Sequence, residues 1–386
     1  MISQAARALV APTDDVRRAE QLLQPLIEAA GIVINGSAPH DLQVHDRRLY
    51  QRVLRQGSLG FGEAYVDGWW DAEALDQCLA KLIQANLKEK VRGNMVLLAH
   101  AFKSRVLNMQ AIGRAFEVGE KHYDIGNDLY RAMLDERMVY TCGYWRDATD
   151  LAAAQEAKLD LVCRKIGLQP GMRVLELGCG WGSFARFAAE RYGVSVVGYT
   201  VSRAQVELGR ATCAGLPVEL RLADYRDASG QFDAVVSIGI MEHVGHKNYR
   251  SYMEVADRCL APDGVAFVHT IAGNISRTLI DPWIHKYIFP NALLPSLAQL
   301  GRAMEGLFFV EDLHNIGPDY DLTLMAWFDN FERAWPTLQH HYDERFYRVW
   351  KYYLLQCAAG FRTRYTQLFQ LVLSRPGSRQ PDCRKS

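Results

Sequence analysis

Val174-Leu-Glu-Leu-Gly-Cys-Gly-Trp-Gly182 is the stretch that decides the fold, because three glycines stand at alternate positions directly after a short apolar strand. Glycines at the end of a strand let the backbone pass close to a bulky nucleoside. The helix expected at residues 182–192 begins with N–H groups that a ligand can reach. Neither Lys-Ser nor Lys-Thr follows the glycines, which excludes a phosphate-binding P-loop. The pattern predicts a site for an adenosyl ligand.

Two details of this stretch favour S-adenosylmethionine over a dinucleotide. Glu176 precedes the glycines, where S-adenosylmethionine-dependent methyltransferases usually carry an acid. The spacing of Gly178, Gly180 and Gly182 also differs from the dinucleotide pattern G-x-G-x-x-G. Because G-x-G alone also marks ordinary strand-to-helix turns, the assignment depends on this context.

The chain after residue 151 alternates between strand and helix patterns, which predicts a doubly wound α/β sheet. The five strands expected first are 173–177, 194–200, 218–223, 232–239 and 265–271. Pro262-Asp-Gly264 predicts a tight turn before the fifth strand. Residues 367–374 predict a late strand that pairs antiparallel near the edge of the sheet.

Length and composition narrow the class of protein. A chain of 386 residues favours one catalytic domain with a smaller partner. Lys+Arg and Asp+Glu are equal at 44 each, which argues against chain-wide attraction to nucleic acid. The eight cysteines form no C-x-x-C pair, which favours reduced thiols in the cytoplasm over disulfides or a zinc site. The sequence shows neither a signal-peptide pattern nor an apolar run of about 20 residues.

The first part of the chain has a helical pattern, with Leu22, Leu23, Leu26 and Ile27 on one expected apolar stripe. We therefore expect an N-terminal helical domain at residues 1–105, a linker at 106–120 and a catalytic domain at 121–386. The segment 81–114 carries seven basic residues against one acid, interleaved with apolar residues. Such a segment suits an anionic membrane surface, and it equally suits packing inside the protein with its charges in solvent.

In an open α/β sheet the ligand lies beyond the carboxyl ends of the strands, so the residues after each strand are candidates. In chain order, these candidates are Gly178 to Gly182, Thr200, Ser202, Gln205, Asp224, Tyr225, Glu242, His243, His269 and Ile271. The second strand ends in Gly198-Tyr-Thr200 rather than in the usual acid for the ribose hydroxyls, which makes Gln205 the expected replacement. Asp224 suits the adenine amino group and Tyr225 the adenine ring, although an aspartate before a turn is also ordinary chain chemistry.

Several of these residues have a structural alternative. Glu242 either holds a polar group in the cavity or caps a helix, and His269 either faces the site or is a satisfied strand histidine. His243 and His246 lack an evident third metal ligand and are interpreted as structural. Tyr320 either begins a helix or points its hydroxyl into the site. The later aromatic residues line a greasy pocket or form core: Trp283, Tyr287, Phe289, Trp327, Phe328, Phe331 and Trp335.

Nearly the whole chain resembles the cyclopropane-fatty-acyl-phospholipid synthases, a family that includes the mycolic acid cyclopropane synthases. Gly57-Ser-Leu-Gly-Phe-Gly-Glu-Ala-Tyr-Val-Asp-Gly-Trp-Trp70 resembles the helical domain of the bacterial phospholipid branch. The catalytic motifs are His122 to Asn127, Tyr140 to Trp145, Leu175 to Gly182, Met241 to Gly245, Asp281 to Pro290 and Asp319 to Trp327. The resemblance implies a Rossmann-like class I methyltransferase domain with a mostly parallel seven-stranded sheet.

The implied reaction transfers a methylene group from S-adenosylmethionine to the cis double bond of an unsaturated phospholipid acyl chain. The family uses bound bicarbonate as the base that deprotonates the intermediate carbocation. The resemblance assigns the bicarbonate site to Cys142, Glu242, His269, Tyr320 and the backbone of Ile271. It assigns the cofactor site to Tyr140, Thr141, Gly178, Gly180, Thr200, Gln205, Asp224 and Tyr225.

The resemblance also implies a homodimer in the cytoplasm, peripherally associated with the inner face of the cytoplasmic membrane, where it draws in an acyl chain. No metal and no nucleic acid are expected. Two rival functions stay open at this point. One is an N-methyltransferase that acts on a lipid head group or a small amine, and the other is a non-catalytic protein that binds lipid or cofactor.

Overall fold

The computed structural model describes residues 14–86 and 126–385. The chain divides into two compact units, residues 1–98 and 99–386. The predicted domain boundaries at 105/106 and 120/121 lie outside the described residues, as does the segment 81–114 apart from its first six residues. Among the described residues, none of the helices is both long and apolar enough to cross a bilayer.

The first unit contains four described helices and a two-stranded antiparallel sheet. These elements are α1 (Asp14–Glu28), β1 (Gln43–Val44), α2 (Arg48–Gln56), α3 (Ser58–Val66), β2 (Trp70–Asp71) and α4 (Leu75–Gln84). The predicted apolar stripe is partly wrong, because Leu22 is 57% exposed whereas Leu23 and Ile27 are buried. Trp70 is fully buried and stacks on Phe61, so the glycine-rich motif forms part of the core of this unit.

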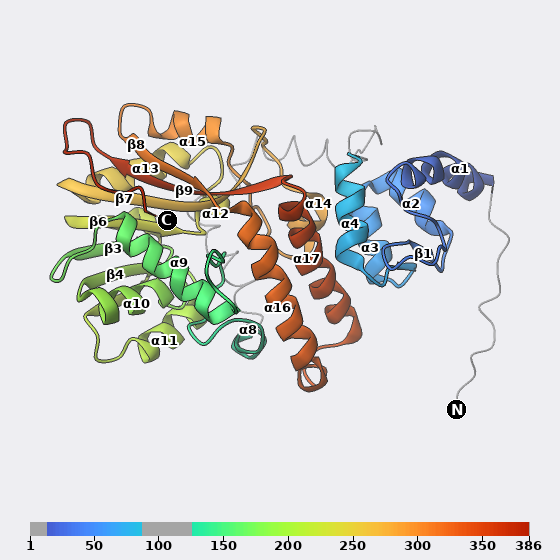
Figure 1. The fold of residues 1–386 in the computed structure, drawn as a ribbon, viewed down its shortest axis with the longest axis horizontal. Coiled ribbons are helices and arrows are strands. Elements are labelled where there is room, and N and C mark those ends of the chain that lie inside the picture. The colour runs from blue at the N-terminus through green and yellow to red at the C-terminus, as the bar shows by residue number, and fades with distance from the viewer. Residues whose placement is uncertain (1–13, 87–125, 386) are drawn as a thin grey trace. The chain divides into compact units, whose positions relative to one another are not determined.

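The second unit is a three-layer α/β structure (Figure 1). Its strands are β3 (Arg173–Leu177), β4 (Ser195–Thr200), β5 (Val218–Leu222), β6 (Phe232–Ile238), β7 (Leu260–Gly273), β8 (Phe309–Asn315) and β9 (Thr366–Ser374). Its α-helices are α8 (Asn127–Met133), α9 (Leu151–Lys165), α10 (Ser183–Tyr192), α11 (Arg203–Thr212), α12 (Met241–Val244), α13 (Tyr249–Cys259), α14 (Pro282–Tyr287), α15 (Leu297–Met304), α16 (Gly317–Leu338) and α17 (Glu344–Arg362). A short 3₁₀ helix, η2 (Tyr225–Asp227), follows β5.

The strand order β5-β4-β3-β6-β7-β9-β8 confirms the predicted seven-stranded, mostly parallel sheet. The first five strands pair in parallel, and β9 pairs antiparallel with both β7 and β8. The late strand was therefore predicted correctly in position and direction. The reversal of strand order between β4 and β6 on either side of β3 is the topological switch point where such sheets bind ligands.

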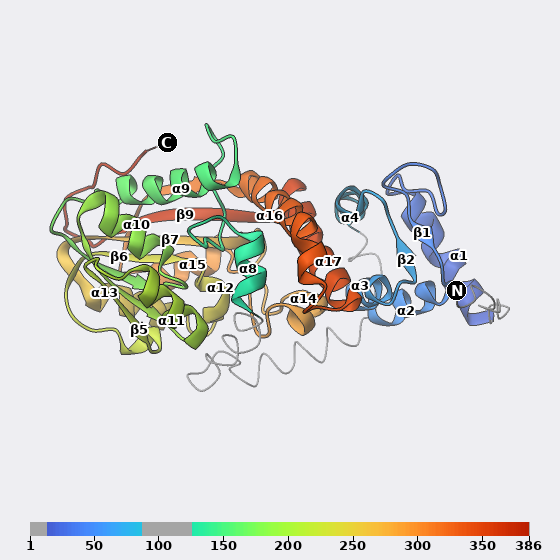
Figure 2. The same cartoon turned by 90° about the horizontal axis from the view of Figure 1, so that it is seen from below.

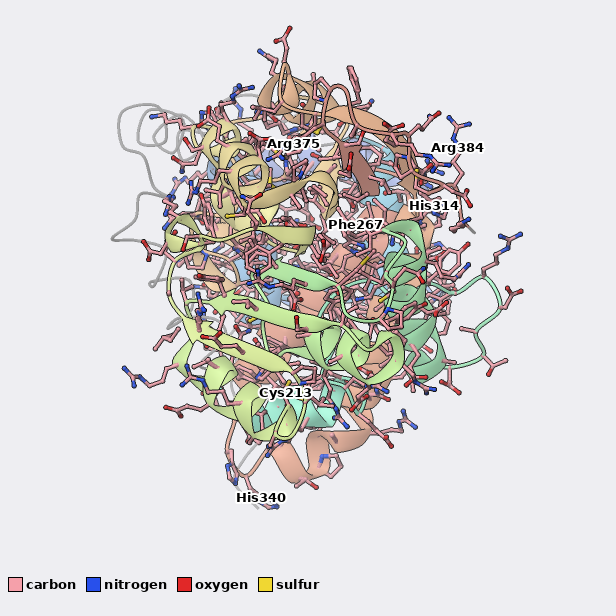
Figure 3. The ribbon with its side chains drawn as sticks, turned by 90° about the vertical axis from the view of Figure 1, so that its left-hand side faces the viewer. Cys213, Phe267, His314, His340, Arg375 and Arg384 are labelled. Atoms are coloured by element: carbon pink, nitrogen blue, oxygen red, sulfur yellow. The ribbon has the colours of Figure 1, made fainter. Side chains whose placement is uncertain are left out.

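Successive strand residues pack on opposite faces of the sheet into two apolar clusters. Helices cover both faces of the sheet (Figures 1 and 2). Leu175 and Leu177 of β3 pack on the face covered by α13 and α15. Val174 packs on the face covered by α9, α10 and α11. Phe267 is fully buried among the strands in Figure 3, whereas the exposed His340 lies at the periphery.

Two details of the strands differ from the expectation. Pro262-Asp-Gly264 lies within β7 rather than in a turn before it, at an irregularity where Leu260 and Val265 face Phe232 and Ala234. Edge strand β8 was missed, because a register shift between Val310 and Asp312 interrupts its alternation.

Candidate active site

A cavity of about 160 Å³ opens at the carboxyl ends of β3, β4, β5 and β6, within the second unit. Its lining comes from the segment before α9, from α9 itself, from the ends of these strands with the loops and helix starts that follow them, and from Asn291 after α14. All eight residues predicted to bind the cofactor line it: Tyr140, Thr141, Gly178, Gly180, Thr200, Gln205, Asp224 and Tyr225. The cavity therefore has the position and the lining that the sequence predicted for an adenosyl ligand.

The glycine turn after β3 brings the backbone to the cavity wall. Gly178 has a φ of 83° and Gly180 a φ of 54°, in the left-handed region that favours glycine. A Cβ at Gly178 would lie 2.7 Å from the side chain of Ile240, which also lines the cavity. A larger residue at this position would therefore displace Ile240, which is part of the cavity wall.

Gln205 is held where the loop after β4 becomes α11. The Ser202 side chain accepts a hydrogen bond from Gln205 N and caps the helix, which fixes the first turn. Thr200 Oγ1 donates to Gln205 Oε1 at 2.9 Å. The two buried side chains support each other, so the Gln205 side chain is held in place in the cavity wall.

Asp224 and Tyr225 occupy the loop after β5. Asp224 is 4% exposed, caps η2 through Arg226 N, and forms a 2.9 Å ion pair with the Arg226 guanidinium. Asp224 therefore both caps a helix, as an ordinary aspartate before a turn does, and lines the cavity. The hydroxyl of Tyr225 is buried without a hydrogen-bond partner among the described residues, and burial raises its pKa to about 12.

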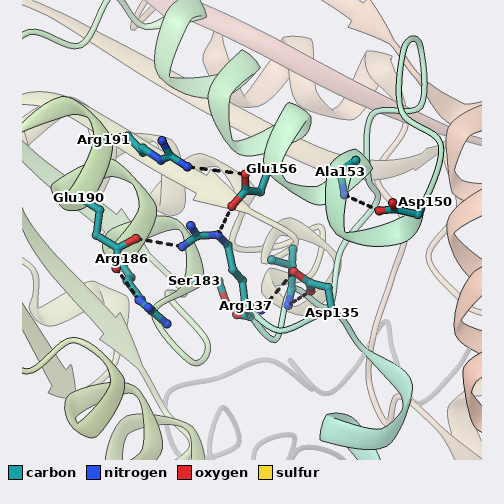
Figure 4. Close-up of polar contacts among 10 residues, drawn as sticks. Asp135, Arg137, Asp150, Ala153, Glu156, Ser183, Arg186, Glu190 and Arg191 are labelled. Atoms are coloured by element: carbon teal, nitrogen blue, oxygen red, sulfur yellow. Dashed lines mark hydrogen bonds and ion pairs between the residues drawn. The ribbon is translucent and has the colours of Figure 1, made fainter.

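The cavity wall at residues 138–141 is tied to two helices (Figure 4). Arg137 pairs with Glu156 of α9 at 2.8 Å and with Glu190 of α10 at 3.1 Å. Ser183 donates its hydroxyl to the carbonyl oxygen of Arg137 at 2.6 Å. Asp135 accepts from the backbone N–H of Val139 at 2.8 Å. These bonds hold the segment that presents Tyr140 and Thr141 to the cavity.

Two side chains of α9 hold Thr141 directly. Gln155 Nε2 donates to the Thr141 carbonyl oxygen at 2.7 Å, and Lys158 Nζ donates to Thr141 Oγ1 at 2.8 Å. Both side chains are buried, and Lys158 lines the cavity beside Glu176. Sequence reasoning missed Lys158. The sequence did contain an indication of its burial. Lys158 lies four residues after Ala154 and three before Leu161, which places it on the same buried side of α9.

The five residues predicted to hold the base do not line this cavity. Four of them are buried, namely Cys142, Glu242, His269 and Tyr320, and Ile271 is partly buried. Cys142 follows Thr141, and Glu242 lies between the lining residues Ile240 and His243. Gly239, which also lines the cavity, donates its N–H to the carbonyl oxygen of His269 at 2.9 Å. The predicted base site is therefore adjacent to the cavity and distinct from its wall.

Glu242 bridges α12 and β7. Its Oε1 accepts from the backbone N–H of Ile271 at 2.5 Å, while Oε2 is buried without a partner among the described residues. Burial raises the pKa of Glu242 to about 7, because desolvation penalises the carboxylate. The alternative that Glu242 caps a helix does not explain its hydrogen bond to Ile271, because Ile271 belongs to strand β7.

His269 lies on the same strand, two residues before Ile271. Its Nδ1 is 3.4 Å from Nε2 of Gln370, its register partner on β9. Its Nε2 is buried and unpartnered within the described part of the chain. Burial lowers the pKa of His269 well below its usual value, so the ring is neutral near neutral pH.

Cys142 lies in the segment before α9, and Tyr320 lies in the first turn of α16. The Cys142 thiol donates to the carbonyl oxygen of Gly143 at 3.1 Å and lies 4.0 Å from Thr323 Oγ1 on α16. Burial raises the pKa of Cys142 well above its usual value, which makes it a thiol rather than a nucleophilic thiolate. Tyr320 stacks on Phe361 at 4.6 Å, and its pKa is raised by burial and by nearby Cys142, among other groups.

The later aromatic residues surround these sites without lining the cavity. Trp327 contacts the rings of both Tyr140 and Tyr320, at 5.1 and 5.9 Å. Phe331 and Trp335 pack against Tyr347 and join α16 to α17. The described residues hold no group of three or more His, Cys, Asp or Glu side chains arranged for a metal.

Comparison with known proteins gives a consistent match. Residues 110–371 match the family model described as mycolic acid cyclopropane synthetase. The cyclopropane-fatty-acyl-phospholipid synthase of Escherichia coli (strain K12) is 47% identical over 97% of this chain and 97% of its own. Tuberculostearic acid methyltransferase UfaA1 of Mycobacterium tuberculosis is 33% identical over 97% of this chain and 92% of its own.

Solved structures match the second unit in fold and in sequence. The cyclopropane synthase MmaA2 from Mycobacterium tuberculosis aligns with a TM-score of 0.64 and 31% identity, over 67% of this chain and 98% of that one. Mycolic acid cyclopropane synthase CmaA1 in complex with SAH and CTAB aligns with a TM-score of 0.63 and 33% identity, over the same shares.

Proposed function

The chain belongs to the mycolic acid cyclopropane synthetase family, and on that premise we propose that it is a cyclopropane-fatty-acyl-phospholipid synthase. The enzyme transfers a methylene group from S-adenosylmethionine to the cis double bond of an unsaturated phospholipid acyl chain. The products are a cyclopropane ring and S-adenosylhomocysteine. The observation that carries the proposal is 47% identity over 97% of both chains to the Escherichia coli enzyme of that name.

The cavity fits an adenosyl cofactor. The glycine turn permits close backbone approach, and the buried Gln205 and Asp224 offer polar groups at the ends of neighbouring strands. A relative at 33% identity has been solved with SAH, which supports the same use of the site here. We assign cofactor binding to the eight predicted residues that line the cavity, from Tyr140 to Tyr225.

The surrounding residues suit chemistry that must exclude water. An alkene is a weak nucleophile, so its reaction with a sulfonium methyl depends on alignment in a closed apolar site. The carbocation that follows would be quenched by water, and aromatic faces stabilise positive charge. Tyr140, Tyr320 and Trp327 form such an aromatic surface directly beside the cavity.

We also propose that bicarbonate binds between Cys142, Glu242, His269, Tyr320 and the backbone of Ile271. When bound, bicarbonate supplies the base that takes a proton from the transferred methyl group. The residues fit such a group, because Glu242 Oε2 and His269 Nε2 are buried polar atoms without partners among the described residues. A carboxylate acceptor and a neutral imidazole donor match the donor and acceptor positions of bicarbonate.

The first unit and the segment after it are our candidates for membrane docking. We propose a helical lipid-docking domain at residues 1–105, a linker at 106–120 and the catalytic domain at 121–386. The basic residues of the segment 81–114 favour binding to anionic lipids. Vesicle co-sedimentation should then strengthen with anionic lipid and weaken with salt, and equal binding to neutral vesicles at every ionic strength would reject this proposal.

We propose a homodimer that works in the cytoplasm at the inner face of the cytoplasmic membrane. The support is the resemblance to the bacterial phospholipid branch, whose substrate is a membrane lipid. Analytical ultracentrifugation of the full chain measures the oligomeric state directly. A purely monomeric species at micromolar concentration would contradict the proposal.

The experiment that tests the function incubates the full chain with S-adenosylmethionine and vesicles of cis-unsaturated phospholipid. Mass spectrometry should show one added CH₂ on the acyl chain, and NMR should show cyclopropane protons in place of the olefin signals. A modified head group would support the N-methyltransferase instead. Less than one product per chain would support a non-catalytic binding protein.

A further inference from the structure

A fully buried lysine in the cavity wall has no acidic partner within the described part of the chain. Lys158 of α9 is 1% exposed and lines the cavity. Its Nζ donates to Thr141 Oγ1 at 2.8 Å, and it forms no ion pair among the described residues. The carboxylates of Asp135 and Glu176 influence it only from longer range. A buried ammonium group that has lost its water needs an anion in return.

The second buried lysine of α9 shows the usual solution. Lys165 lies about two turns further along the helix, and its side chain is 0% exposed. Its Nζ is 2.5 Å from Oδ2 of Asp312 on β8. Lys165 does not line the cavity. The helix thus carries one lysine that is neutralised by the protein and one that faces the ligand cavity.

An acidic side chain lines the same cavity as Lys158. Glu176 of β3 is 2% exposed, and its Oε2 has no hydrogen-bond partner among the described residues. Burial raises the pKa of Glu176 to about 8 and lowers the pKa of Lys158 to about 8, because each charged form loses hydration. This part of the wall therefore presents an unmatched basic group and an unmatched acidic group to one ligand.

We propose that Lys158 binds the carboxylate of the amino-acid end of S-adenosylmethionine. The carboxylate is the only anionic group of that molecule, whereas its ammonium and sulfonium groups are positive. A carboxylate beside Lys158 supplies the missing counter-charge, and Glu176 is left to face the positive groups. The hydroxyl of Thr141, which accepts from Lys158, then lies at the same end of the cofactor. This inference rests on the proposed function, because it presupposes S-adenosylmethionine as the cofactor.

The test removes the charge from the protein and from the ligand in turn, and it measures binding rather than activity. Isothermal titration compares S-adenosylhomocysteine with its decarboxylated analogue, which keeps the adenosine, the sulfur and the amine. The wild-type protein should bind S-adenosylhomocysteine about tenfold or more tightly than the analogue. In Lys158→Met this preference should fall to within about twofold, and Lys158→Arg should restore part of it.

A matched control is Lys165→Met combined with Asp312→Leu, which removes the other buried lysine together with its partner. That variant should keep the wild-type preference between the two ligands. If Lys158→Met weakens both ligands equally, Lys158 only supports Thr141 and the proposal is wrong. If the wild-type protein binds both ligands equally, the proposal is also wrong, whether or not the variants fold. Failure of the wild-type protein to bind S-adenosylhomocysteine at all would instead contradict the proposed function.

Discussion

Replacing Glu242 with glutamine should make the protein more stable and much less active. The amide keeps the oxygen that accepts from Ile271 N, and it replaces the buried Oε2, which has no partner among the described residues. Burial raises the pKa of Glu242 from 4.5 to about 7. At about 1.4 kcal/mol per pKa unit, ionisation of the buried carboxyl group lowers the free energy of unfolding by about 3 kcal/mol. An unpaired buried amide N–H costs about 1 kcal/mol, which leaves a net gain of about 2 kcal/mol.

The sign of this effect depends on pH. The folded state keeps the proton of Glu242 up to about pH 7, whereas the unfolded chain loses it near pH 4.5. The stability that Glu242 contributes to the wild-type protein therefore falls as the pH rises from about 4.5 to about 7, and it stays low at higher pH. Chemical denaturation should show Glu242→Gln more stable than wild type at about pH 8, and no more stable at about pH 4.

Activity should respond in the opposite direction. Turnover of Glu242→Gln should fall about a hundredfold or more, because the amide cannot act as the carboxylate partner of the base. Cofactor affinity should change less than about twofold, because Glu242 does not line the cavity. Wild-type turnover rising with pH through about 7 would agree with the raised pKa. Glu242→Gln with wild-type turnover, or with equal destabilisation at both pH values, would refute this reasoning.

Four further substitutions test other parts of the second unit. Gly178→Ala should weaken cofactor binding about tenfold or more in a titration, because the new Cβ would lie 2.7 Å from Ile240 and the backbone φ of 83° disfavours alanine. Unchanged affinity would contradict this reasoning. In chemical denaturation, Lys165→Met alone should lower the free energy of unfolding by about 3 kcal/mol, because it leaves Asp312 without its ion-pair partner. Adding Asp312→Leu should recover most of this loss. Gln370→Leu should lower turnover about tenfold through the adjacent histidine while cofactor affinity stays constant, and equal loss of both would indicate a purely structural role.

The fold was predictable because the sequence expresses it locally. The glycines after β3 and the alternation of strand and helix patterns identify the sheet and its switch point. Strand β8 was not predictable in this way. Its register shift between Val310 and Asp312 breaks the period of two, and the strand it pairs with, β9, is distant in sequence.

The cavity residues from Gly178 to Tyr225 were likewise predictable, because they follow parallel strands that end at one edge of the sheet. Tyr140 and Thr141 follow helix α8 rather than a strand, and they came from the resemblance. Glu242, His269 and Ile271 were also candidates because they follow strands, but their grouping with Cys142 and Tyr320 came from the resemblance alone, since nothing in the local sequence brings Cys142 near Tyr320. Lys158 was missed because a lysine in a helix is usually solvated. Its burial depends on Thr141 and on the cavity, which appear only when the chain is folded.

The position of β9 between β7 and β8 sets an order for folding during synthesis. Strand β7 is 14 residues long, and its second neighbour is the last strand of the sheet to leave the ribosome. Until β9 arrives, the apolar β7 has an open edge that can pair with another nascent chain. The sheet of the catalytic unit is therefore completed late. We expect chaperones that shield unpaired strand edges to raise the yield of folded protein without a comparable change in the stability of the folded state.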